Sequence, residues 1–468
     1  MRYIRRGIAL CLLLALLMTT ALAEAPFLQH TAGWTLEGMP LEVELYADVT
    51  SLMPYDEDRL AMLTQVTDAL SMRLRTGVDE GSVTIRVGQT EALTLAYLDN
   101  AVQLSCIPEM SFTTQSGDPM GTLLGASTAV SMPYGLRADA ETLLDDGWTL
   151  LLALEEPLSA YGKPKNVKTN ITDMGLARTC TDYTIHAGSV GELSPMLLAH
   201  CPEGWLREIL SGLTFSGKQT LRVYRDADGV PLRMEYNGTC GPEGNLRTVK
   251  LVWRMRRDDV AHRDEVTLTS PAKTGTNKNN LEFTRVISRN KQGALVMEGS
   301  FTYTVTLDRQ TTTRKGSFDL TNAYTETADV ITGEVTLQQK LPGEDAFAGI
   351  SFAPDMTLGG TADAPAFTGT VTLSTLSGKN VLDSAVIHID LHPCEVSGWE
   401  AREETLDLDQ LTPEELAALQ GDVAMGVAAS LVRPLIILLG DQADWFFRDM
   451  LPEQIRRITD ASMTVVTY

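Results

Sequence analysis

Alternation of apolar and polar residues runs through the second half of the chain and predicts a long series of β-strands. In the stretch 301–306, Phe301, Tyr303 and Val305 alternate with threonines. Side chains two apart lie on the same face of a strand, so one face of the resulting antiparallel sheet is expected to be buried and the other solvated. The expected strands span residues 180–186, 214–225, 230–236, 246–257, 263–269, 281–289, 294–307, 315–320, 330–340, 349–357, 366–376 and 384–391.

The first part of the chain predicts a strand near residue 41, then a helix and a short meander. The helix is expected from Asp56 to Arg75, because acidic residues open this stretch and basic residues end it. Strands are expected at 82–87, 91–98 and 101–106, with turns between them. Residues 162–166 carry glycine and proline among lysines and are interpreted as a loop.

Helical patterns occupy two later segments. Residues 189–211 predict a helix pair that is kinked at Pro202. Thr412 and Glu415 form a capping-box pattern that begins another helix. Residues 423–439 are almost wholly apolar but include Arg433 and a proline, so a buried core helix is expected rather than a transmembrane span. A segment lying on a membrane surface is the alternative.

These patterns divide the chain into four parts. Residues 1–23 are the signal peptide, 24–177 an N-terminal β-α-β meander unit, 178–400 a second β-α-β unit with a long antiparallel ladder, and 401–468 a C-terminal helical segment. The fold class is α+β and β-rich. Since the helices are too few to cover a flat sheet of this width, we expect a large curved sheet, open and half-barrel-like, with helices packed on its concave face.

The first residues have the features of a cleaved export signal. A basic start at Arg2, Arg5 and Arg6 precedes a short apolar run, and Ala21-Leu22-Ala23 fits the cleavage rule. Cleavage after Ala23 removes three arginines and lowers the formal charge from −23 to −26. A surface this acidic disfavours nucleic acid. The protein is therefore expected to be exported to the cell envelope or the exterior.

Five cysteines follow the signal peptide, and an odd number leaves at least one unpaired. Their spacing fits no zinc-binding pair. The chain therefore holds either one or two disulfides with a spare thiol, or five small buried thiols, and we favour the second alternative. The five are Cys106, Cys180, Cys201, Cys240 and Cys394.

Two clusters carry candidate chemistry. His388, Asp390 and His392 share one face of an expected strand and could ligate a divalent cation, although the solvated side of an amphipathic strand explains them better. The charged residues around Asp264 crowd one hairpin tip. They are interpreted as a solvated ion-pair cluster, with a docking patch as the alternative. No catalytic residue, metal site or cofactor site is expected.

The element order, the meander length and the signal peptide resemble those of the bacterial LolA/LppX-like lipoprotein-carrier superfamily. The resemblance spans residues 41–391 and rests on architecture, not on a motif. It implies an exported protein with an open β half-barrel, plugged by helices, that holds a hydrophobic ligand. The chain differs from that superfamily in lacking a lipid-attachment cysteine and in its greater length.

The sequence predicts a secreted or cell-envelope protein that binds a hydrophobic small molecule or lipid between sheet and helices, without catalysis. An envelope protein partner is the other expected kind of partner. Two alternatives stay open: an interaction or structural module with a solid core, and an extracellular hydrolase with an unrecognised carboxylate pair.

Overall fold

The structure is a computed structural model. It describes residues 27–31, 34, 39–51, 57–76, 80–98, 101–105, 110–113, 143–166, 175–244, 246–257, 261–271, 278–307, 309–394 and 405–447. The expected signal peptide and Cys106 lie outside these residues.

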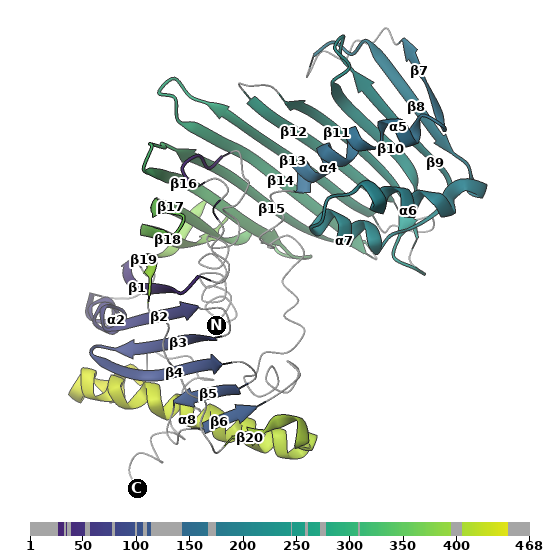
Figure 1. Cartoon of the computed structure of the whole chain (residues 1–468). Coiled ribbons are helices and arrows are strands. Elements are labelled where there is room, and N and C mark those ends of the chain that lie inside the picture. Colours follow the sequence, from purple (N-terminus) through teal and green to yellow (C-terminus); the bar gives the residue numbers. More distant parts are fainter. Residues whose placement is uncertain are drawn as a thin grey trace.

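The described strands form one open sheet of 20 strands (Figure 1). Neighbours pair antiparallel throughout, except for the parallel pair at one edge, β6 and β20. In spatial order the strands are β7 (Gly162–Asn166), β8 (Thr179–Ile185), β9 (Thr214–Arg225), β10 (Pro231–Gly241), β11 (Arg247–Arg257), β12 (Ala261–Pro271), β13 (Lys278–Arg289), β14 (Leu295–Leu307), β15 (Gln310–Asn322), β16 (Ala328–Lys340), β17 (Ala348–Thr361), β18 (Ala364–Ser377), β19 (Asn380–Pro393), β1 (Leu41–Ser51), β2 (Leu70–Thr76), β3 (Glu80–Val87), β4 (Thr90–Leu98), β5 (Ala101–Ser105), β6 (Met110–Thr113) and β20 (Leu406–Asp407).

The expected open antiparallel ladder is confirmed. Strand β1 pairs on one side with β2 and on the other with β19, so the strands of the two expected β-α-β units belong to one continuous sheet. The division of the chain into units stays a prediction. The helices are α2 (Glu57–Ala69), α4 (Leu143–Ala153), α5 (Glu155–Leu158), α6 (Val190–His200), α7 (Trp205–Ser211), α8 (Pro413–Leu439) and α9 (Ala443–Trp445).

Two local expectations were wrong. The helix expected from Asp56 to Arg75 ends at Ala69, and the rest is strand β2. Leucines there fit both a helical and a two-residue spacing, but only a strand lets Arg73 face the carboxylate of Glu44, to which it donates at 2.7 Å. The expected loop at residues 162–166 is edge strand β7, whose lysines and proline protect an exposed edge from further pairing.

One side of the sheet is apolar along its whole width, and we call it the apolar face. The hydrogen-bonded register places hydrophobic residues opposite one another from strand to strand. One row, from β9 to β14, reads Val223, Met234, Trp253, Val266, Phe283 and Phe301. Another, from β18 to β5, reads Phe367, Leu391, Val43, Leu74, Val83, Leu95 and Leu104.

The covering segments contact this same face at separate places. Helices α4 to α7 cover β8 to β12, and α8 covers β3 to β6 at the other end (Figure 1). Residues 27–31 and Trp34, here called the N-terminal segment, pack between them over β14 to β19 and β1. Packing on the concave side of a half-barrel stays a prediction.

A buried aspartate holds the N-terminal segment. Asp329 of β16 has no exposed surface and accepts hydrogen bonds from the backbone N–H groups of Gln29 and Thr31 at 2.9 and 2.8 Å. It also accepts from the Thr31 hydroxyl at 2.8 Å and from the amide of Asn322 at 2.7 Å. Asn322 in turn donates to the carbonyl oxygen of Phe27 at 2.8 Å. Burial alone would raise the pKa of Asp329, but these hydrogen bonds outweigh it and lower the pKa.

Replacing Asp329 is therefore expected to detach the N-terminal segment. Asp329→Ala leaves buried donors without an acceptor and should lower the free energy of unfolding by about 3 kcal/mol. Asp319→Ala, at an exposed position on the adjacent strand, should change it by less than about 0.5 kcal/mol. Urea unfolding measures both values. Because the folded-state pKa is lowered, the contribution of Asp329 is complete above pH about 4 and is lost as the pH falls further.

Candidate functional site

Five side chains of the apolar face lie between the covered regions and belong to neither hydrophobic cluster. Each is partly exposed, although each lies on the side of the sheet that is buried elsewhere. We call them the aromatic strip: Leu281 and Phe283 of β13, Phe301 and Tyr303 of β14, and Phe318 of β15. They form a continuous apolar surface at the centre of a 20-stranded sheet.

Two glycines shape the aromatic strip. A Cβ at Gly299 would clash with the ring of Phe318, and a Cβ at Gly316 would clash with the ring of Phe301. Each ring therefore occupies the space in which a neighbouring side chain would stand. The rings of Phe283 and Phe318 lie 6.4 Å apart between centroids. These glycines let three phenylalanines spread over the backbone, which makes the surface broad and apolar.

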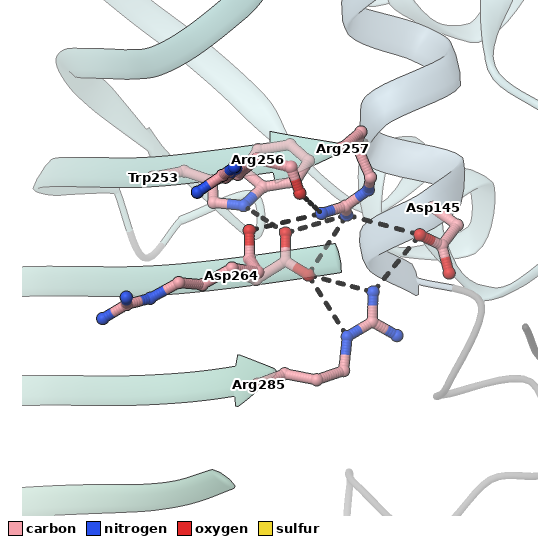
Figure 2. Close-up of polar contacts among 7 residues, drawn as sticks. Asp145, Trp253, Arg256, Arg257, Asp264 and Arg285 are labelled. Carbon is pink, nitrogen blue, oxygen red and sulfur yellow. Dashed lines mark hydrogen bonds and ion pairs between the residues drawn. The ribbon is translucent and has the colours of Figure 1, made fainter. Parts of the chain in front are cut away.

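A charged cluster adjoins the aromatic strip at Arg285, which is two residues from Phe283 on β13. Figure 2 shows the contacts within this cluster. Asp264 of β12 has no exposed surface and accepts from the indole N–H of Trp253 at 2.9 Å. It also accepts from Arg257 at 2.8 Å and from Arg285 at 3.0 Å. Both arginines donate in addition to Asp145 of α4, at 3.3 and 3.2 Å. The two guanidinium groups and two carboxylates are formally neutral together.

The interpretation of the charges around Asp264 as solvated was wrong for Asp264 itself. This residue shares its face with Val266 and points into the covered apolar face, whereas Arg263 and Glu265 point to the other side. The alternation along residues 263–268 already places Asp264 on the same face as Val266 and Leu268. What the sequence could not supply is the partner on α4, which lies more than 100 residues away.

Polar atoms remain unpartnered beside this cluster. Arg257 and His262 are opposed residues of β11 and β12. Arg257 Nε and His262 Nδ1 are both buried and have no hydrogen-bond partner. Burial and the neighbouring Arg257 lower the pKa of His262. Buried polar groups without partners are uncommon, and they mark a place where a further polar group would be accommodated.

The histidines proposed as metal ligands lie where the alternation places them. His388, Asp390 and His392 share the polar face of β19, and the intervening Ile389 and Leu391 are buried. Residues four apart on a strand are separated by about 13 Å, too far for both imidazoles to contact one ion at about 2 Å. Among the residues that the structure describes, no group of three or more potential ligands is arranged to hold a metal.

Each histidine instead has a neighbour on strand β1. His388 Nε2 lies 2.7 Å from Asp48 Oδ2, and its ring stacks on Tyr46 with centroids 4.2 Å apart. His392 lies 3.8 Å from Glu42. These contacts join β19 to β1 on the polar face, so this trio has a structural explanation.

A polar cavity of about 190 Å³ lies beside β2 to β5. Its charged residues pair with neighbouring side chains: Arg73 donates to Glu44 and lowers the pKa of that carboxyl, and Arg75 pairs with Glu42. The cavity suits water or a small polar molecule. It is lined by Arg73, Arg75, Ser82, Thr84, Glu91, Thr94 and Ser105.

Helix α8 begins at the expected capping box and buries one stripe, which includes Val423 and Val432. Ile437 is 76% exposed. Among the described residues, 413–445 form the one helical stretch long and apolar enough to cross a membrane, a test that core helices also pass. Its assignment as a core helix therefore stays a prediction.

Four of the cysteines lie in the described part of the chain. Cys180, Cys201 and Cys240 are buried, and Cys394 is partly exposed. Burial raises the pKa of each of the three buried thiols. Raised pKa values make these thiols unreactive, so they offer no candidate nucleophile.

Comparisons with known proteins identify no family. No family model and no curated protein matches the chain. Among solved structures, the outer-membrane protein OmpT of Vibrio cholerae is similar over 76% of this chain and 95% of its own, at 9% identity and a TM-score of 0.28. OccK9 of Pseudomonas aeruginosa is similar over 76% and 98%, at 9% identity and a TM-score of 0.13. Scores this low do not establish a shared fold.

The charged cluster is expected to be needed for stability. Asp264→Ala leaves two buried guanidinium groups without their carboxylate and should lower the free energy of unfolding by about 3–5 kcal/mol. The matched control is Glu265→Ala, next in sequence, whose ion pairs on the polar face are partly exposed and should contribute less than about 1 kcal/mol. Equal losses in urea unfolding would contradict the burial of Asp264.

Proposed function

We propose that the protein is an exported cell-envelope protein that holds a hydrophobic ligand on its aromatic strip, without catalysis. The observation that carries the proposal is the position of this surface. Apolar side chains are left partly exposed on the one face of the sheet that the rest of the chain covers. Binding sites for apolar molecules are lined mainly by hydrophobic and aromatic side chains, as the aromatic strip is.

The proposed location rests on the first residues of the chain. A basic start, an apolar run and the small residues at Ala21 and Ala23 have the pattern of a cleaved export signal. A ligand-binding role outside the cytoplasm agrees with the resemblance to the LolA/LppX-like superfamily in element order.

The free energy available is sufficient for useful affinity. Each methylene group removed from water contributes about 0.8 kcal/mol. A chain of about ten methylenes would thus gain roughly 8 kcal/mol when it is fully buried, and about half of that when only one side is buried. The entropy cost of association is at least about 4 kcal/mol, so useful affinity requires most of the chain to be buried.

Loss of one ring is expected to weaken binding. Phe283→Ser should raise the dissociation constant for a fluorescent apolar probe, such as a phenylnaphthylamine, by about tenfold. Val381→Ser serves as the control, because Val381 is 56% exposed and lies near the start of β19, four strands from β15 of the aromatic strip. Its substitution should leave probe binding unchanged.

Native mass spectrometry of protein purified from an envelope extract adds an independent measurement. The expected result is a lipid-sized adduct that disappears on denaturation. If the protein has a clean apo mass and binds no apolar probe, the proposal is wrong and an interaction module with a solid core is the better account.

A further inference from the structure

The aromatic strip and the charged cluster adjoin each other. Arg285 and Phe283 are two apart on β13 and share the apolar face. Arg285 also lies opposite Gly299, whose side-chain space is filled by the ring of Phe318. An apolar surface therefore leads directly to a pair of arginines.

We propose that the ligand is a long-chain monocarboxylic acid whose chain lies on the aromatic strip and whose carboxylate binds Arg257 and Arg285 in place of Asp145. This inference rests on the proposed function and specifies the chemical class of its ligand. Two guanidinium groups that already bind carboxylates have the donor geometry that a carboxylate headgroup needs.

The two aspartates of the cluster differ in exposure and in the length of their hydrogen bonds to the arginines. Replacement of one of them by a ligand carboxylate requires such a difference. Asp264 has no exposed side-chain surface and holds both arginines from the sheet. Asp145 is 37% exposed and reaches the same arginines from α4 with longer hydrogen bonds. Asp145 is thus the replaceable partner, and Asp264 keeps the arginines in position.

At the position of the Asp145 carboxylate, a ligand group with a single negative charge is favoured. Replacing the carboxylate of Asp145 with the carboxylate of the ligand leaves the buried part of the cluster neutral, so no additional charge is desolvated. Asp145 itself can return to water, where an isolated carboxylate is well solvated. The Nε of Arg257 has no hydrogen-bond partner, so this guanidinium group has one further donor. A neutral headgroup would accept weaker hydrogen bonds from the arginines and would supply no charge to replace that of Asp145.

The exchange would also move the start of α4. The ring of Trp148 lies 5.5 Å from the Arg257 guanidinium, and a Cβ added at Gly147 would lie 3.3 Å from the ring of Trp253. Both tryptophans therefore report on release of Asp145. Binding of the acid is expected to shift tryptophan fluorescence, and Trp148→Phe should remove much of that shift.

The test compares three ligands with the same twelve-carbon chain, measured by displacement of the naphthylamine probe from the full-length mature protein. Dodecanoate is expected to bind at least tenfold more tightly than 1-dodecanol, and also more tightly than dodecyl phosphate. Asp145→Asn is expected to tighten dodecanoate binding about threefold and to leave 1-dodecanol unchanged, because it removes the competing carboxylate. Asp228→Asn, which removes one charge from an exposed turn, should change neither.

The outcomes separate the two proposals. Equal affinity for dodecanoate and 1-dodecanol would overturn the carboxylate site and leave the hydrophobic surface intact. Tighter binding of dodecyl phosphate, or no effect of Asp145→Asn, would also overturn it. Failure of both dodecanoate and 1-dodecanol to bind would overturn the proposed function, and this inference with it.

Discussion

The structure depends on one requirement: a very wide sheet with a single apolar face must be covered by a few short segments. Burial of that face is the main favourable contribution to folding. Helices α4 to α7 cover one end, α8 covers the other, and the N-terminal segment lies between them. The aromatic strip is one part of the face that these segments leave partly exposed, so the candidate site follows from the same requirement as the fold.

Two buried aspartates fix the covering segments in place. Asp264 orients arginines that bind α4, and Asp329 binds the backbone of the N-terminal segment. Apolar contacts are not directional, so they alone would allow a covering segment to slide over the sheet. Hydrogen bonds to a buried carboxylate have strict geometry and define one position for each segment. Because the covering segments flank the aromatic strip, fixing their positions also defines the edges of the strip.

The sequence predicts most of the sheet but little of the candidate site. Alternation located β9 and β14 almost to the residue, because strand periodicity is a local property. It did not separate α2 from β2, since Leu70 and Leu74 satisfy both periods. Asp329 gives no local signal, because its partners at Gln29 and Thr31 lie about 300 residues earlier. The aromatic strip was equally hidden: alternation shows which face a phenylalanine occupies, but not whether another segment covers it.

The pairing of β1 with β19 has a consequence for the order of folding. Strands β9 to β19 follow one another as antiparallel neighbours with short connections, so each can pair with its predecessor as soon as it emerges. Strand β1 is synthesised early, but its partner β19 follows much later. Asp48 of β1 and His388 of β19, which contact each other, are 340 residues apart in the sequence. The first strand therefore stays unpaired on that side until nearly the whole chain has been synthesised. A chaperone that shields an exposed strand edge during this interval would aid the yield of folded protein more than it would change the stability of the final structure.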